Sequence, residues 1–244
     1  MAAKERHAAA FITLLLMVLH SSAEEDSAPA GKKVYVDIFK FLNTDDPILS
    51  FTISRSSGNP CKVDFYRNTT ASGTLFERFY WAPNRRTNLE QMFHDSLKGV
   101  FQNSGTAAPE VLNTMYVSKV ENSKNRKGKS PKSVDGQRSR ETTINYENIY
   151  STEMIEYQDD DDKCAVFAIK PGGRGAMPHS YEFRIRASAV ADSSGHACFS
   201  KVQEFVDNFP NERLQAPQAS MLTNCRNKCE VNFSCRAYMS PGHQ

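Results

Sequence analysis

The chain has 244 residues, of which 39% are hydrophobic, so it can form one large domain or two small ones. Its 30 basic and 28 acidic residues nearly cancel, and this balance gives no global reason for binding nucleic acid. Only one long apolar run occurs, close to the N-terminus, and we therefore expect a soluble protein with neither a nucleic acid nor a membrane as partner.

The N-terminus has the pattern of a secretory signal peptide over residues 1–23. A charged head at residues 4–6 precedes an apolar core, residues 8–19, that is too short to span a bilayer comfortably, and small residues follow it. An N-terminal membrane anchor is the alternative. Cleavage would leave a polar leader, residues 24–33, and 28 basic against 27 acidic residues, a net charge of 28 − 27 = +1.

The next segment predicts one short helix followed by strands. Val34, Ile38, Phe41 and Leu42 are spaced as on a helix, which should stop at Asp45–Pro47. Apolar residues then recur with period two, or in short runs bounded by turn residues, in eight strand candidates: 48–54, 61–68, 74–81, 97–101, 113–119, 149–157, 164–170 and 180–188. A second helix with one apolar stripe is predicted over residues 197–209.

Eight sequential strands with short turns favour an antiparallel up-and-down barrel, because full closure removes exposed sheet edges. The prediction is a mainly β domain over residues 34–225, with a short N-terminal helix and a C-terminal helix packed outside the barrel. A cysteine-containing tail, residues 226–244, follows. A two-sheet sandwich would have the same strand count. An eight-stranded barrel is just wide enough to hold one small ligand.

Four consecutive aspartates, Asp159–Asp162, lie between two strand candidates. Adjacent carboxylates repel one another and favour solvent, so a solvated hairpin turn is the simplest interpretation. A calcium loop would alternate its acids with other residues and place a glycine at the bend, which this run does not. We expect no metal site here.

Residues 121–143 carry many basic side chains and no aromatic residue, between the fifth and sixth strand candidates. The composition is typical of a disordered loop. Binding of heparin or another polyanion is the alternative function for this segment.

All six cysteines lie after the predicted signal peptide, and an even number in an oxidising compartment indicates disulfides. A zinc site is the rival for the cluster "CRNKCEVNFSC", but this cluster has no histidine at ligand spacing. Asn68 in "NTT" and Asn232 in "NFS" are acceptors for N-glycosylation in a secreted chain.

Several strings resemble the salivary lipocalins of ticks, in the branch grouped with histamine-binding proteins. They are "DIFKFLNTDDPILSFTIS", "PCKVDFYRN", "NTMYVS", "DDKCAVFAIKP" and "YEFRIRAS", in order and at compatible spacing from about Val34 to about Cys225. The resemblance implies an eight-stranded lipocalin barrel, secreted in saliva, that sequesters a small host mediator to evade host defence. We further expect a monomer without a cofactor.

The resemblance also implies disulfides. A cysteine on the second strand is tied to the C-terminal segment in such proteins, and one on the seventh strand to the trailing helix, which implies Cys61–Cys225 and Cys164–Cys198. Cys229 and Cys235 remain, to close a local loop, which is our prediction, or to pair with another chain.

The ligand that the resemblance implies first is a biogenic amine such as histamine, which needs a buried carboxylate and aromatic faces. The matching positions here are Asp37 and the triplet Glu182, Phe183 and Arg184, while Leu49 stands where the family has a tryptophan. Arg184 would neutralise Glu182 from the same strand face. If instead the apolar face of this strand points inward, Glu182 is a surface charge.

Aromatic residues on strand candidates complete the expected ligand-binding set: Tyr66, Phe79, Trp81 and Phe167. A lipid mediator such as a leukotriene is the alternative ligand, with Arg78 or Arg184 against its carboxylate.

Catalysis is not expected. The histidines are scattered, no serine or cysteine has a nucleophile-elbow context, and "PGGRG" after the seventh strand candidate leads into another strand rather than a helix. A different class of function stays open, in which the barrel is a filled scaffold and its surface binds a host protein or a polyanion.

Overall fold

The computed structural model describes residues 36–54, 61–84, 86–105, 111–120, 148–172, 180–190, 194–209 and 213–239. The predicted signal peptide, the polar leader and the basic segment 121–143 lie outside these residues. No helix within the described ranges has both the length and the apolar character needed to cross a membrane.

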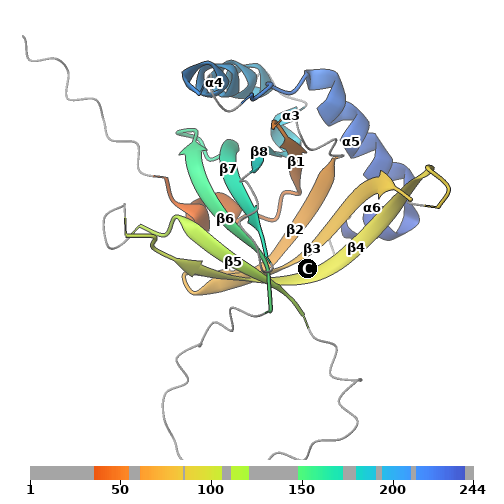
Figure 1. Cartoon of the computed structure of the whole chain (residues 1–244), viewed down its shortest axis with the longest axis horizontal. Helices are drawn as coiled ribbons and strands as arrows, with labels where there is room; N and C mark the ends of the chain where they lie inside the picture. The colour runs from red at the N-terminus through yellow and green to blue at the C-terminus, as the bar shows by residue number, and fades with distance from the viewer. Residues whose placement is uncertain are drawn as a thin grey trace, which may run out of the picture. The chain divides into compact units, whose positions relative to one another are not determined.

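Eight strands close into one barrel in chain order, each antiparallel to the next, and the last strand pairs with the first (Figure 1). The strands are β1 (Ile48–Thr52), β2 (Lys62–Thr70), β3 (Gly73–Pro83), β4 (Glu90–Gln102), β5 (Thr114–Lys119), β6 (Ile149–Gln158), β7 (Cys164–Pro171) and β8 (Ser180–Arg186). The predicted mainly β fold with an eight-stranded up-and-down barrel is confirmed, and the sandwich alternative is wrong.

Alternation along each strand gives the barrel wall an inner and an outer face. On β2, Asp64 and Tyr66 face inward, whereas Val63 and Phe65 belong to the apolar cluster shared with the C-terminal helices. All four are buried, because both faces of this part of the wall are covered.

A single helical turn, α2 (Ile38–Leu42), packs into one end of the barrel interior. Asp37 caps it, because its Oδ1 accepts hydrogen bonds from the backbone N–H groups of Phe39 and Lys40. Ile38, Phe41 and Leu42 are fully buried against interior residues of the barrel. The helix ends before the predicted stop at Asp45–Pro47, with Asn43 as its C-cap.

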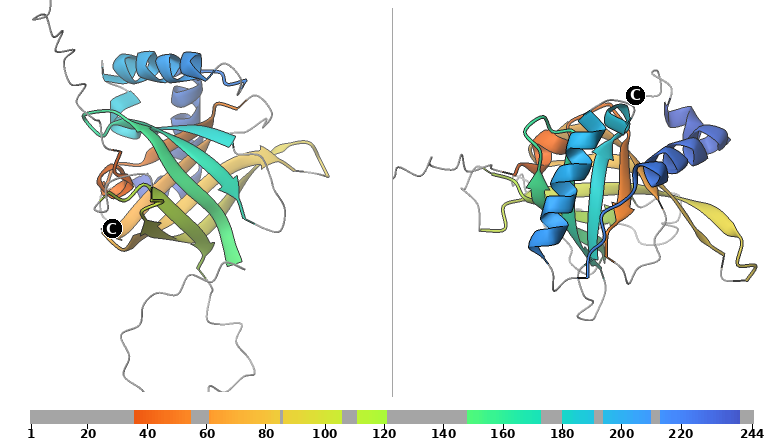
Figure 2. Two further views of the ribbon diagram at one scale, coloured as in Figure 1. Left: turned by 60° about the vertical axis from the view of Figure 1, so that its left-hand side comes forward. Right: turned by 90° about the horizontal axis from the view of Figure 1, so that it is seen from above.

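The outer face of the wall is covered by C-terminal helices: α3 (Ala187–Val190), α4 (Ser194–Asn208), α5 (Ala219–Val231) and α6 (Phe233–Met239) (Figures 1 and 2). The predicted helix over 197–209 corresponds to α4, which buries Val202 and Val206 against the barrel. The segment expected to be a tail is helical, and the predicted boundary between residues 225 and 226 falls inside α5.

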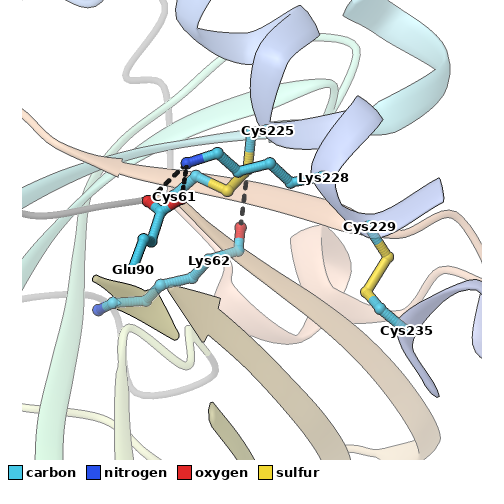
Figure 3. Close-up of a disulfide and its surroundings, with 7 residues drawn as sticks. All are labelled: Cys61, Lys62, Glu90, Cys225, Lys228, Cys229 and Cys235. Carbon is cyan, nitrogen blue, oxygen red and sulfur yellow. Dashed lines mark hydrogen bonds and ion pairs between the residues drawn. A yellow bond between two sulfur atoms is a disulfide. The ribbon is translucent and has the colours of Figure 1, made fainter. Parts of the chain in front are cut away.

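Disulfides tie these helices to the barrel (Figure 3). Cys61 pairs with Cys225 and Cys164 with Cys198, at Cα separations of 5.5 and 6.0 Å, and Cys229 pairs with Cys235 at 5.1 Å. These are the three predicted pairs, and the last one closes a local loop rather than joining another chain. An ion pair between Lys228 Nζ and Glu90 Oε1, 2.6 Å apart, adds a second contact between α5 and the wall.

The four aspartates form the predicted turn between β6 and β7. The Asp159 N–H donates to the Cys164 carbonyl at 3.0 Å, and the Asp162 N–H donates to the Asp159 carbonyl at 3.1 Å. Asp160 and Asp161 are exposed. Asp159 is half-buried, and its Oδ1 accepts a hydrogen bond from the Cys164 N–H. The run is therefore a capped hairpin turn with a solvated tip.

Candidate functional site in the barrel interior

Six charged side chains meet in the middle of the barrel interior, and we call them the interior charge cluster: Lys62, Asp64, Arg78, Glu153, Glu182 and Arg184. They come from β2, β3, β6 and β8, whose alternation places them on the inward face. All except Lys62 are at most 2% exposed. Buried charges at this density persist only where they are paired.

Arg78 is held by two carboxylates. Its Nε and Nη2 donate to the two oxygens of Asp64, both at 2.8 Å, across the β2–β3 register that places these residues opposite each other. Its Nη1 donates to Glu153 Oε1 at 3.0 Å. Three of its nitrogens are thus used, and the bidentate bond fixes the plane of the guanidinium.

Arg184 shares Glu153 with Arg78 and connects the second half of the cluster. Its Nη2 donates to Glu153 Oε2 at 2.6 Å and to Glu182 Oε2 at 3.0 Å, and the Lys62 ammonium donates to the other oxygen of Glu182. The expected neutralisation of Glu182 by Arg184 is confirmed. The alternative of a solvated surface Glu182 is wrong, because this carboxylate is 2% exposed inside the barrel.

These contacts keep the acids ionised. Burial by itself would raise the pKa of Glu182, but the charges of Lys62 and Arg184 outweigh it and lower the pKa to about 2. Burial likewise opposes ionisation of Glu153, and Arg184 and Arg78 together hold its pKa well below the ordinary value. No acid of the cluster is left to balance the charge of an incoming cation.

Hydrogen-bond donors, in contrast, are in excess at Arg184. Its Nε and Nη1 are buried and have no hydrogen-bond partner among the described residues. The same holds for the buried Oγ of Ser50, the residue opposite Arg184 in the β1–β8 register. The guanidinium also lies over the Phe167 ring, 4.1 Å from its centroid. Unpaired buried donors cost free energy until an acceptor reaches them, so this spot is suited to an acceptor group.

The net charge of the inward-facing side chains also suits an acceptor that is negatively charged. Alternation places Arg186 on the same face of β8 as Glu182 and Arg184, and its Nη2 donates to the Phe41 carbonyl at 3.2 Å while its buried Nε has no partner. Together with the cluster it makes four cations against three carboxylates. Counting this partly buried arginine, these seven side chains carry one positive charge more than negative, although Arg184 itself is paired with Glu153 and Glu182.

The other end of the interior, away from α2, is aromatic and partly solvent-accessible, and we call it the exposed end: Tyr80, Phe93, Asp95, Lys119 and Tyr150. The Tyr80 and Phe93 rings stack with centroids 5.3 Å apart. Asp95 Oδ1 accepts from Lys119 Nζ at 2.6 Å, the Lys119 ammonium lies 5.4 Å from the Tyr150 ring centroid, and Asp95 Oδ2 is buried without a partner.

Electrostatics confirm that these groups act on one another. Burial, and next the charge of Asp95, raise the pKa of Tyr80. Burial also raises the pKa of Tyr150 to about 12, with Arg78 lowering it and Asp95 raising it to smaller extents. The exposed end thus combines a carboxylate that has a spare acceptor with aromatic rings, the groups that an organic cation requires.

Four of the predicted ligand-binding residues meet inside the barrel. Glu182 and Arg184 belong to the interior charge cluster, Phe167 lies under Arg184, and the Tyr66 hydroxyl donates to Asp64 Oδ2 at 3.4 Å.

Of the other four predicted ligand-binding residues, three belong to the outer apolar cluster and one caps α2. Phe79 and Trp81 alternate with the inward Arg78 and belong to the outer cluster, where Phe79 packs against Tyr238 of α6 with ring centroids 5.3 Å apart. Phe183 packs in the same way against Phe199 of α4. Asp37 is the N-cap of α2. Phe79, Trp81 and Phe183 thus lie in a layer packed under the C-terminal helices, and the role of all four residues in ligand binding stays a prediction.

The sequence analysis did not single out several interior residues: Ser50, Lys62, Asp64, Asp95, Lys119, Tyr150 and Glu153. A signal for them exists on β2, where Lys62, Asp64 and Tyr66 alternate with Val63 and Phe65. The apolar set was the natural choice for the inward face of a barrel. Prediction of α5 and α6, which cover this part of β2, would have assigned the apolar set to the outward face.

Metal ligation finds little support in the described part of the chain. Asp159, Cys164 and Cys198 are close enough together to hold an ion, but both sulfurs are joined in a disulfide and offer no thiolate. The three cysteines of "CRNKCEVNFSC" are likewise all bonded to other sulfurs.

No protein-family model matches the sequence, and a search of the curated proteins finds no match of significance. The likeness to tick lipocalins therefore stays a prediction, and the functional argument depends on the interior of the barrel.

Proposed function

We propose that this chain is a secreted carrier whose barrel binds one small molecule with an acidic head group, such as a lipid mediator with a carboxylate, and so sequesters a mediator from a host. The observation that carries the proposal is the pair of unpartnered donors on buried Arg184, beside the unpartnered hydroxyl of Ser50. A carboxylate supplies two acceptor oxygens for these donors, and its negative charge would offset the one cation by which the inward-facing side chains exceed their carboxylates.

The surroundings suit the rest of such a ligand. Phe167 lies directly under the Arg184 guanidinium, and the half-buried rings of Tyr80 and Phe93 at the exposed end offer apolar surface to a hydrocarbon chain. Three disulfides accord with an oxidising, extracellular compartment, and this supports the proposed secretion into saliva.

Calorimetric titration of the secreted, disulfide-bonded chain tests the proposal with a matched pair of probes, oleic acid and oleyl alcohol. We expect the acid to bind much more tightly than the alcohol, and leukotrienes to behave like the acid. Equal affinities would contradict the role of Arg184, because the two probes share the hydrocarbon chain and differ at the head group.

Two interior variants locate the head group. Arg184→Lys keeps a cation near Glu153 but removes Nε and Nη1, and should weaken binding of oleic acid about 10- to 100-fold, the value of a charge-assisted hydrogen bond. Ser50→Ala removes an unpartnered hydroxyl, so it should leave stability intact and weaken binding about fivefold. Phe183→Leu, on the outer face of the same strand, is the control and should leave the affinity unchanged.

A biogenic amine is the second candidate, favoured by one specific observation at the exposed end. There the Lys119 ammonium already lies between a carboxylate and an aromatic ring, the position that the ammonium of histamine or serotonin would take. Asp95 Oδ2 offers a further acceptor. The amine would thus bind away from Asp37 and Glu182, the two acids that the family resemblance implies.

Opposite effects of two substitutions test this candidate. Asp95→Asn should weaken histamine binding at least about tenfold, the scale of one charge-assisted hydrogen bond, while Lys119→Met should strengthen it by removing the competing internal cation. If both variants bind histamine as the parent does, the amine candidate fails.

A barrel that binds neither class would favour the third hypothesis, in which the surface binds a host protein or a polyanion. Retention on heparin that is lost when residues 121–143 are deleted would support it.

A further inference from the structure

The two most exposed large apolar side chains in the described part of the chain flank one asparagine. Val231, the last residue of α5, is 83% exposed, and Phe233, the first residue of α6, is 78% exposed. An exposed valine or phenylalanine alone is ordinary, but two on either side of one residue form a local apolar patch that solvent disfavours.

The residue between them is Asn232, the acceptor of the sequence Asn232-Phe233-Ser234. Its backbone N–H donates to the Cys229 carbonyl at 3.1 Å, and its side-chain Oδ1 accepts the Cys235 N–H at 3.1 Å, so it closes α5 and caps α6. The Cys229–Cys235 disulfide spans the same corner. Because the cap uses only Oδ1, a group attached at Nδ2 does not remove this hydrogen bond.

We propose that Asn232 carries an N-linked glycan whose first sugars cover Val231 and Phe233. In the transfer, the Asn232 Nδ2 forms a bond to C1 of the first sugar of a lipid-linked oligosaccharide diphosphate. The bond from C1 to the diphosphate oxygen breaks, the lipid diphosphate leaves with the electron pair, and Nδ2 loses one proton. The inference depends on passage through the secretory pathway, which belongs to the proposed function, but not on the ligand of the barrel.

Geometry favours the glycan over a protein as the occupant of this patch. The patch is small and lies on both sides of the acceptor, and the cap and the disulfide both involve residues of this corner. A pyranose ring presents C–H groups that pack on an aromatic face, and its hydroxyls then face water, so the glycan converts an apolar corner into a polar one.

Asn68 provides an internal control. It is exposed near the β2–β3 turn, with a positive φ of 48° at a shift in strand register, a conformation that asparagine tolerates. Its sequence Asn68-Thr69-Thr70 is also an acceptor. Occupancy at Asn68 reports that the chain has met the transferase.

The experiment is glycopeptide mass spectrometry of the full chain secreted from insect cells, followed by fluorescence of the apolar dye anilinonaphthalene sulfonate with the folded protein. We expect Asn232 to be occupied. Ser234→Ala should abolish this occupancy while keeping the Asn232 cap, and should raise the dye fluorescence. Ser234→Thr, which preserves the acceptor sequence, should do neither. Adding Val231→Ser and Phe233→Ser to Ser234→Ala should return the fluorescence to the parent level.

Occupied Asn68 with bare Asn232 overturns the inference and leaves secretion standing. Both sites bare in the secreted chain overturn the inference alone, whereas a chain that the insect cells retain and do not secrete overturns the proposed secretion. Occupied Asn232 with unchanged dye fluorescence in Ser234→Ala overturns the covering of Val231 and Phe233 by the glycan.

Discussion

The two faces of β8 differ in chemistry, because the inward face is charged and the outward face is apolar. Inward, Glu182 and Arg184 join a cluster of buried charges, and outward, Phe183 and Ile185 are fully buried in the apolar layer under α4. Apolar burial stabilises in proportion to area and tolerates changes of shape, whereas buried charges stabilise little in total but cost much when one partner is lost. The outer layer and its disulfides therefore stabilise the fold, whereas the interior is specialised for polar contacts.

The largest effect is expected from the disulfide that ties the outer layer to the barrel. Replacing Cys61 and Cys225 with serine opens a loop with a sequence separation of 164. The chain-entropy relation gives a loss of about 5 kcal/mol for a loop of this length. Unfolding in guanidinium chloride, monitored by circular dichroism, measures it.

The Cys229–Cys235 bridge is the matched control, since its sequence separation is 6 and it joins α5 only to α6. Its removal should cost about 2 kcal/mol by the same relation. Equal losses for the two pairs would show that the long bridge does not hold the outer layer to the wall.

The second-largest loss of stability is expected when Glu153, the carboxylate shared by Arg78 and Arg184, is replaced. Glu153→Gln keeps the shape but removes the charge that faces both Arg78 and Arg184, and should destabilise the protein by about 3–5 kcal/mol, as does breaking a buried ion pair. The free energy of unfolding from denaturant curves is again the measurement.

Glu204→Gln, in an exposed pair with Lys201 on α4, is the control and should change stability by less than about 0.5 kcal/mol. If Glu153→Gln is as mild as this control, the interior charges are not coupled as the contacts indicate.

Lowering the pH is expected to reduce the free energy of unfolding by a smaller amount. The pKa of Glu182 is about 2 in the folded chain against an ordinary value of 4.5, so the unfolded chain binds a proton first as the pH falls. The stability from Glu182 is complete above pH 4.5, and about 2 kcal/mol of it should be lost by pH 3. Glu153, whose pKa is lowered as well, acts in the same direction.

Unfolding curves recorded between pH 5 and pH 3 test this sign. In Glu182→Gln the decline over that interval should become shallower, because one of the responsible carboxylates is gone. A decline of unchanged steepness in the variant would assign acid sensitivity to other groups.

The smallest loss of stability is expected from removing the N-cap of α2, the helix that packs into one end of the barrel interior. Asp37→Ala removes the acceptor for the N–H groups of Phe39 and Lys40 and should cost about 1 kcal/mol, the typical value of an N-cap. Asp37→Ser keeps an acceptor and should recover most of the loss. Because Asp37 caps α2, neither variant should alter ligand affinity, and a large change in affinity with Asp37→Ser would return this carboxylate to the binding site.

Period-two patterns and short apolar runs were sufficient to predict eight strands, because each strand has to bury at least one apolar face. Closure into a barrel was favoured by the cost of exposed sheet edges rather than by the pattern, which a sandwich would share. They did not show which face points inward. On β3, Arg78 and Phe79 are both nearly completely buried, so burial of an apolar residue does not identify the inner side when helices cover the outer one.

The C-terminal helices were underestimated for a related reason. The segment "CRNKCEVNFSC" is polar and rich in cysteine, and α5 buries only Leu222, Cys225 and Cys229. Its position is set by disulfides and by the ion pair of Lys228 with Glu90, contacts between distant residues that no local pattern contains. Phe79, for example, packs against Tyr238 of α6, a contact that the sequence pattern did not indicate.

The most direct test of the central claim is a crystal structure of the secreted chain grown with oleic acid. The proposal predicts a carboxylate oxygen within hydrogen-bond distance of Arg184 Nε or Nη1 and close to Ser50 Oγ, the donors that now lack partners. If these donors are met only by water, or if the acid binds outside the barrel, the interior of this protein is not its binding site for an acidic ligand.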